Sequence, residues 1–74
     1  MSKFQEKVQS ELVEARSKHR NIYSIHEAVA VILEEFEEFK AEVFKRDPNL
    51  ALIRDELIQV AAMCQRTAED LKLV

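Results

Sequence analysis

The sequence contains no glycine and only one proline among its 74 residues. Phosphate-binding P-loops, dinucleotide-binding GxGxxG turns and GxSxG nucleophile elbows all need glycine at strained or crowded backbone positions. None of these three sites can therefore form here. Tight β-hairpins are also disfavoured, because their usual turns need glycine. If the chain handles phosphates, it must use metal ions, basic side chains or helix N-termini.

Other features are nearly or wholly absent as well. The only cysteine is Cys64, so no internal disulfide can form, and a reducing cytoplasm fits. No apolar run approaches the ~20 residues that span a bilayer. The opening residues, MSKFQEKVQSE, lack the apolar core of a signal peptide. The net charge of −3 leaves no overall nucleic-acid footprint. We therefore expect a cytoplasmic protein with no membrane or nucleic-acid partner.

What the chain does contain is typical of a globular helical protein. Nearly half of its residues are apolar and a third are charged. The spacing of the apolar residues predicts three helices, over about residues 3–18, 25–45 and 48–71. The fold class is therefore all-α, with a single domain over residues 1–74.

Two local signals mark where the second and third helices begin. Ser24 and Glu27 form the S-x-x-E pattern of a capping box at the start of the second helix. Asp47 followed by Pro48 predicts an N-cap and a first-turn proline for the third helix.

Apolar stripes run along both of the longer helices. On the second helix the stripe alternates steps of four and three residues, as in helices packed on other helices: Ile25, Val29, Ile32, Phe36, Phe39 and Val43. The main stripe of the third helix is similar: Ile53, Leu57, Val60, Cys64, Thr67 and Leu71. We therefore predict that Cys64 is a core residue.

The third helix has a second apolar strip, formed by Ile58, Ala61 and Ala62. One interpretation is burial by a partner helix from another subunit, and the other is a set of scattered surface groups. A chain this short buries only roughly 60% of its unfolded surface, so its core is small. We expect a three-helix unit that assembles into a helical bundle through oligomerisation.

The stretch LEEFEEFKAE, residues 33–42, holds five glutamates. A helix advances about 100° per residue, which places Glu35 and Glu38 on one flank of the apolar stripe and turns Glu34 outward. The same geometry places Glu56 and Gln59 on one flank of the third helix. If these flanks face each other, four oxygen-bearing side chains converge.

Two interpretations of this acidic pattern remain open. Glu35, Glu38 and Glu56 have no basic residue three or four positions away on their own helices. Partly buried carboxylates without partners are costly unless a cation or another residue neutralises them. Oxygen ligands favour Mg²⁺, Mn²⁺ or Ca²⁺. The alternative is an ordinary solvated charged face.

Several basic residues could receive a phosphate group. Lys18 and Arg20 lie where the first helix ends, and Arg66 continues the line of Glu56 and Gln59. The alternatives are structural, because cations interact favourably with a helix C-terminus and Arg66 can pair with Asp70.

The carboxylate motifs resemble those of the MazG-like family of all-α nucleoside triphosphate pyrophosphohydrolases. Residues 34–38 match its EExxE motif, and Glu56 with Gln59 stands where the family has ExxD. The resemblance covers about residues 22–71. It implies that Mg²⁺, or Mn²⁺, is bound by Glu35, Glu38, Glu56 and Gln59. Glu34 would be an accessory carboxylate.

The resemblance also implies a reaction and an assembly. The reaction is hydrolysis of a nucleoside triphosphate to the monophosphate and pyrophosphate, with Glu35, Glu38 and Glu56 as catalytic residues. The assembly is a homodimer or homotetramer. Gln59 replaces the usual acidic ligand, so the alternative is a non-catalytic helical module that binds nucleotide or a protein partner.

Overall fold

The computed structural model describes residues 1–74 and consists of three α-helices without a strand. The helices are α1 (Lys3–Lys18), α2 (Ile25–Val43) and α3 (Leu50–Asp70). The predicted all-α class is therefore confirmed. None of the three helices combines the length and the apolar character needed to cross a membrane.

The first two helices begin at serine caps. The Ser2 hydroxyl accepts a hydrogen bond from the Gln5 N–H at 3.1 Å, and the Gln5 side chain accepts one from the Ser2 N–H at 2.7 Å. Ser24 caps α2 as predicted, by accepting from the Glu27 N–H at 3.1 Å. The Glu27 carboxylate accepts from the Tyr23 N–H instead of closing the box on Ser24.

The predicted start of the third helix is wrong. Asn49 is the N-cap, because its side-chain oxygen accepts hydrogen bonds from the free N–H groups of Ala51 and Leu52 at 2.9 and 3.3 Å. Pro48 therefore precedes the cap, and Asp47 lies in the connection. The second helix ends at Val43, slightly earlier than predicted.

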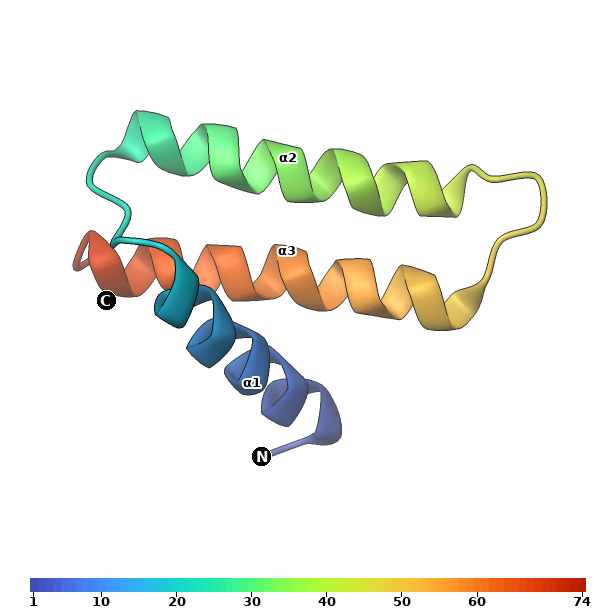
Figure 1. Ribbon diagram of the computed structural model, residues 1–74, viewed down its shortest axis with the longest axis horizontal. Coiled ribbons are helices and arrows are strands. Elements are labelled where there is room, and N and C mark those ends of the chain that lie inside the picture. The colour runs from blue at the N-terminus through green and yellow to red at the C-terminus, as the bar shows by residue number, and fades with distance from the viewer.

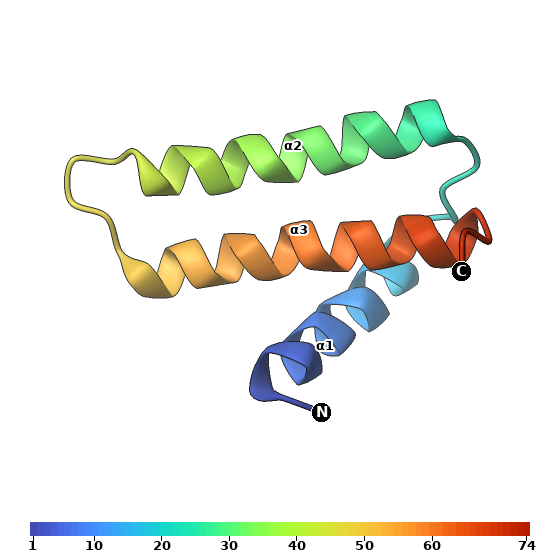
Figure 2. The same cartoon turned by 180° about the vertical axis from the view of Figure 1, so that it is seen from behind.

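The three helices are arranged around α3. In Figure 1, α2 and α3 lie side by side and run in opposite directions, while α1 crosses the other side of α3 obliquely. The reverse view in Figure 2 shows the same order. The backbone of α3 contacts both other helices, whereas the backbones of α1 and α2 do not contact each other. Helix α3 therefore lies between α1 and α2 and contacts both of them.

The core lies between α1 and α3. Its buried side chains are Val8, Ala15, Ile58, Ala62 and Met63, with Val31, Ile32 and Ala61 packed against them. The second apolar strip of α3 is therefore covered by α1 of the same chain. The prediction of a partner subunit over that strip is wrong, because helical phase shows that a strip is buried but not which helix covers it.

The two predicted main stripes are only partly buried. Cys64 and Leu57 on α3 are exposed, so the prediction of a core role for Cys64 is wrong. On α2, the side chains of Ile25, Val29 and Phe36 are also exposed. Ala28, which lies near the start of α2 and outside the predicted stripe, is the one residue of this helix that is fully buried.

An ionic network joins the end of α3 to the connection between α1 and α2. The Asp70 carboxylate accepts hydrogen bonds from the Ile22 N–H at 2.8 Å and from the Arg16 guanidinium at 2.7 Å. Burial acts to raise the pKa of Asp70, but these hydrogen bonds outweigh it and hold the pKa below its ordinary value. Asp70 therefore fixes the start of α2 relative to α3.

Candidate metal centre

Three carboxylates from two helices converge between α2 and α3. Glu35 and Glu38 lie one turn apart on α2, and Glu56 lies on α3. Each offers an oxygen, and these three oxygens all lie within 4.8 Å of one another. Glu35 and Glu56 are half-buried, whereas Glu38 is exposed. The structure thus brings together the three acids that helical phase placed on facing flanks.

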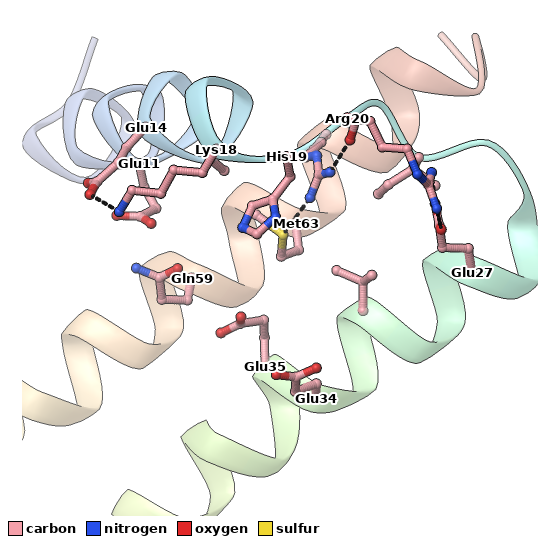
Figure 3. Close-up of a pocket in the computed structure, with 14 residues that line it drawn as sticks. Glu11, Glu14, Lys18, His19, Arg20, Glu27, Glu34, Glu35, Gln59 and Met63 are labelled. Atoms are coloured by element: carbon pink, nitrogen blue, oxygen red, sulfur yellow. Dashed lines mark hydrogen bonds and ion pairs between the residues drawn. The ribbon is translucent and has the colours of Figure 1, made fainter.

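Gln59, the fourth residue of the predicted set, lies one turn after Glu56 on α3. Figure 3 shows the Glu35 carboxylate extending from α2 toward Gln59 on α3, and both residues line the same cleft. Its carbonyl oxygen is a neutral ligand, so it would add coordination without adding charge.

The pKa values of Glu35 and Glu56 are both raised. Burial, followed by repulsion and hydrogen bonding from Glu38, raises the pKa of Glu35 from 4.5 to about 7. Burial and the charges of Glu38 and Glu42 likewise raise the pKa of Glu56. Without a cation Glu35 and Glu56 therefore retain protons at pH values where an ordinary glutamate has lost them.

Two buried oxygens near the cluster have no hydrogen-bond donor. One is Oε2 of Glu56, and the other is Oε1 of Glu42, whose second oxygen pairs with Lys45 at 2.7 Å. An unpaired buried carboxylate oxygen costs free energy, and a bound cation would satisfy it. Glu42 was not among the predicted ligands, although its side chain leaves the axis of α2 in a direction between those of Glu35 and Glu38.

The spacing of the oxygens can be compared with the needs of each ion. Opposite ligands of Mg²⁺ lie about 4.2 Å apart, and those of Ca²⁺ about 4.6–5.2 Å apart. The 4.8 Å limit on the Glu35, Glu38 and Glu56 oxygens accommodates Ca²⁺ directly. Magnesium would require the widest pair to approach by at most about 0.6 Å, which small side-chain rotations supply. The donor set fits a hard divalent cation.

A cleft of about 410 Å³ lies beside the cluster, between α1 and α2. Glu34 and Glu35 form part of one wall, and Lys18 and Arg20 lie on the other side (Figure 3). Arg66, the third predicted phosphate-binding residue, also lines the cleft. The cleft therefore contains both acidic and basic side chains next to the candidate ion site.

The three basic residues differ in their ion-pair and hydrogen-bond partners. Lys18 pairs with Glu14 at 2.8 Å, and Arg20 pairs with Glu27. Both side chains are largely exposed, and solvent screens such pairs, so a phosphate group could replace either partner. Lys18 and Arg20 thus remain candidates for phosphate contact.

Arg66 is instead built into the fold. Its side chain is buried, and one guanidinium nitrogen donates to the backbone oxygen of Arg20 at 2.6 Å. Its Nε lies 3.8 Å from Asp70, which is the predicted pairing along α3. We infer that Arg66 positions the Arg20 segment at the rim of the cleft. The sequence could not show this contact, because it joins residues far apart in the chain.

No protein-family model matches this chain, and neither the curated proteins nor the solved structures include one significantly similar to it. Its function is therefore inferred from the carboxylate geometry and from the spacing of the motifs.

Proposed function

We propose that the chain is a Mg²⁺-dependent nucleoside triphosphate pyrophosphohydrolase. The observation that carries this proposal is the convergence of Glu35, Glu38 and Glu56, with a buried oxygen of Glu56 that has no donor. The motif spacing on two consecutive helices supports it, and Mn²⁺ would substitute for Mg²⁺ because both ions prefer oxygen ligands.

In this proposal the residues of the cluster have separate tasks. Glu35, Glu38 and Glu56 would hold the cation, and Gln59 would complete the set with its carbonyl oxygen. The bound ion would neutralise the triphosphate and lower the pKa of a bound water. Glu34, which is exposed at the cleft beside Glu35, would orient the attacking water as an accessory carboxylate.

The cleft would accept the triphosphate. Lys18 and Arg20 line it and carry exposed charges that can exchange a carboxylate partner for a phosphate oxygen. The cation would neutralise part of the repulsion between the triphosphate and the acidic wall that Glu34 and Glu35 form. Water would attack one phosphorus of the α–β phosphoanhydride, and the bond between these two phosphates would break to give the monophosphate and pyrophosphate.

A second function is favoured by one observation, the amide at Gln59. An amide in place of a carboxylate removes one negative charge from the ion site. The chain would then be a helical module that binds nucleotide, or a protein partner, without turnover. The same residues would hold the ligand, but no pyrophosphate would be released.

One experiment separates these functions. Pyrophosphate release is measured with Mg²⁺ and each nucleoside triphosphate and deoxynucleoside triphosphate, alongside thermal unfolding of the same samples. Magnesium-dependent release that Glu38→Ala lowers by about 100-fold or more supports the enzyme. Stabilisation by Mg²⁺ and nucleotide without release supports the binding module. If there is neither pyrophosphate release nor stabilisation, the result contradicts both proposed functions.

A matched control for this experiment lies next to the cluster. Glu37 is exposed, points away from the cluster and lies 3.8 Å from Lys40. Glu37→Ala removes the same charge from the same helix, so it should leave release and stabilisation unchanged. The proposal also includes an oligomer, a homodimer or homotetramer, as the working form of this small chain.

A further inference from the structure

The buried side chain of Arg66 has only one hydrogen bond to an oxygen atom. It is 7% exposed, and a guanidinium carries five N–H donors. One Arg66 nitrogen, Nη2, donates to the Arg20 backbone oxygen at 2.6 Å. The other terminal nitrogen, Nη1, reaches only the Met63 sulfur at 3.6 Å, and Nε has no hydrogen-bond partner. A thioether is a weak acceptor, so Nη1 remains available to an oxygen atom of a ligand.

A carboxylate lies near this donor on the same cleft. Met63, Arg66 and Glu27 all line the cleft, and Figure 3 shows Met63 and Glu27 on it. Glu27 is held by the Arg20 guanidinium and by the Tyr23 N–H. The Arg20 hydrogen bond is the main reason that the pKa of Glu27 is lowered, and the charge of nearby Arg66 contributes. The cleft therefore presents a donor, Arg66, close to an ionised acceptor, Glu27.

This donor and acceptor lie at the end of the cleft away from the candidate ion site. Glu27 precedes Glu35 by eight residues on α2, which is about 12 Å along the helix. Arg66 follows Glu56 by ten residues on α3, which is about 15 Å. Because α2 and α3 run in opposite directions, both displacements lead toward the same end of the cleft (Figure 1). A nucleotide lying along the cleft with its phosphates at the ion site therefore brings its base to Arg66 and Glu27.

The middle of the cleft suits the flat faces of a base. Ala15, Val31 and Met63 come from three different helices and give the cleft apolar walls. Its volume of about 410 Å³ lies within the range of small-ligand sites. No aromatic side chain lines it, so stacking on an aromatic ring cannot select a base here. Discrimination between bases must come from hydrogen bonds at the edge of the ring.

We propose that Arg66 and Glu27 select nucleobases in which a carbonyl oxygen lies next to a ring N–H, as in guanine, hypoxanthine, uracil and thymine. Arg66 donates from Nη1 to the carbonyl oxygen, and Glu27 accepts from the ring N–H. Adenine and cytosine carry an amino group next to a bare ring nitrogen, so donor would face donor and acceptor would face acceptor. This inference rests on the proposed function, because the ion site holds the phosphates. It leaves Lys18 to contact the phosphates, while Arg20 orients Glu27.

The test compares deoxyinosine triphosphate with deoxyadenosine triphosphate. These two purine nucleotides differ only at the edge that Arg66 and Glu27 would contact, so size and sugar are matched. The kcat/KM for pyrophosphate release is measured for each with Mg²⁺ and the full chain. We expect the deoxyinosine nucleotide to be preferred by at least about tenfold. Equal values, or a preference for the deoxyadenosine nucleotide, would overturn the proposal.

Two variants test the assigned residues. Arg66→Lys keeps the charge but cannot reach both the Arg20 carbonyl and a ligand, and Glu27→Gln presents an amide that can turn either atom to the base. Each should reduce the preference to within about threefold. Glu14→Gln is the matched control, because Glu14 lines the same cleft and pairs with Lys18, and it should keep the wild-type preference. A preference that survives in Glu27→Gln, or an equal loss in Glu14→Gln, contradicts the proposal even if Arg66→Lys does not fold.

A binding measurement separates failure of this proposal from failure of the proposed function. The affinities of deoxyinosine monophosphate and deoxyadenosine monophosphate are measured by calorimetry without metal, so neither the ion nor hydrolysis is involved. Equal hydrolysis of the two triphosphates would leave the enzyme standing and the base preference wrong. No hydrolysis, with tighter binding of deoxyinosine monophosphate, would leave the base site standing and the enzyme wrong. If there is neither hydrolysis nor a preference between the monophosphates, both are wrong.

Discussion

The Glu35 and Glu56 side chains offer oxygens within 4.8 Å of each other across the α2–α3 contact, although 21 positions separate them in the chain. Glu38 joins them, and no basic side chain pairs with any of the three. Like charges this close destabilise a fold unless a proton or a cation lies between them. The arrangement therefore has consequences for stability that can be measured without knowing the substrate.

The first consequence is a stability that decreases with rising pH in the absence of metal. Because the pKa of Glu35 is about 7 in the folded state and 4.5 ordinarily, the folded state binds more protons than the unfolded state between these values. Stability is then fully present below about pH 4.5 and is lost as pH rises through about 7. Urea unfolding at about pH 5.5 and about pH 8 should show greater stability at the lower value.

Magnesium should reverse this trend, since the cation replaces the proton between the carboxylates. Adding Mg²⁺ at about pH 8 should raise the urea midpoint more than adding it at about pH 5.5. Equal midpoints at both pH values, with and without Mg²⁺, would mean that Glu35 has an ordinary pKa.

The second prediction concerns Glu35→Gln. Without metal at about pH 8, this substitution should stabilise the fold by about 1 kcal/mol, because it removes a repelled and partly buried charge. It should also flatten the pH dependence and abolish stabilisation by Mg²⁺. Glu37→Gln is the control, since Glu37 is exposed and next to Lys40. A destabilised Glu35→Gln would show that the carboxylate has a partner that stabilises it.

Gln59→Asp is the third prediction. A carboxylate at this position, one turn after Glu56, should tighten Mg²⁺ binding by about tenfold, or 1.4 kcal/mol. Without metal it should also lower stability, because it adds a fourth negative charge beside the cluster. Calorimetric titration with Mg²⁺ measures the first effect. An unchanged affinity would exclude Gln59 as a ligand.

The fourth prediction concerns Asp70, whose side chain is only 3% exposed. Asp70→Asn keeps an acceptor for the Ile22 N–H, but it leaves Arg66 without a carboxylate and leaves Arg16 with Glu69 alone. Loss of one member of a buried charge network should cost about 3 kcal/mol in the free energy of unfolding. The exposed Asp55 supplies the control. Asp55→Asn should change the free energy of unfolding by less than about 0.5 kcal/mol. Equal effects would show that the network contributes nothing.

Much of the fold follows from local signals in the sequence. The bounds of α1 match the prediction, and Ser24 caps α2 because a serine before an apolar run satisfies the free N–H groups there. The start of α3 does not match. Asp47 and Asn49 both have capping side chains on either side of Pro48, and the choice between them depends on the path of the connection. Residue type alone could not distinguish these two caps, because Asp and Asn are about equally favoured at this position.

The candidate site was predictable only in part. The rotation of about 100° per residue was sufficient to place Glu35 and Glu38 on one flank of α2 and Glu56 on one flank of α3. Only the packing of these two consecutive helices on each other was needed to bring the three together. The positions of Arg66 and Cys64 were not predictable. Which side of α3 receives α1 and which receives α2 depends on packing of the whole chain, so phase alone could not distinguish a buried stripe from an exposed one.

The central claim is that Glu35, Glu38 and Glu56 hold a divalent cation. Calorimetric titration of the full chain with Mn²⁺ at about pH 8 tests it most directly, with Glu38→Ala and Glu37→Ala as the paired variants. The wild type and Glu37→Ala should bind the ion with equal affinity, and Glu38→Ala should weaken binding by at least about tenfold. A wild type that does not bind Mn²⁺, or equal affinities in the two variants, would contradict the claim.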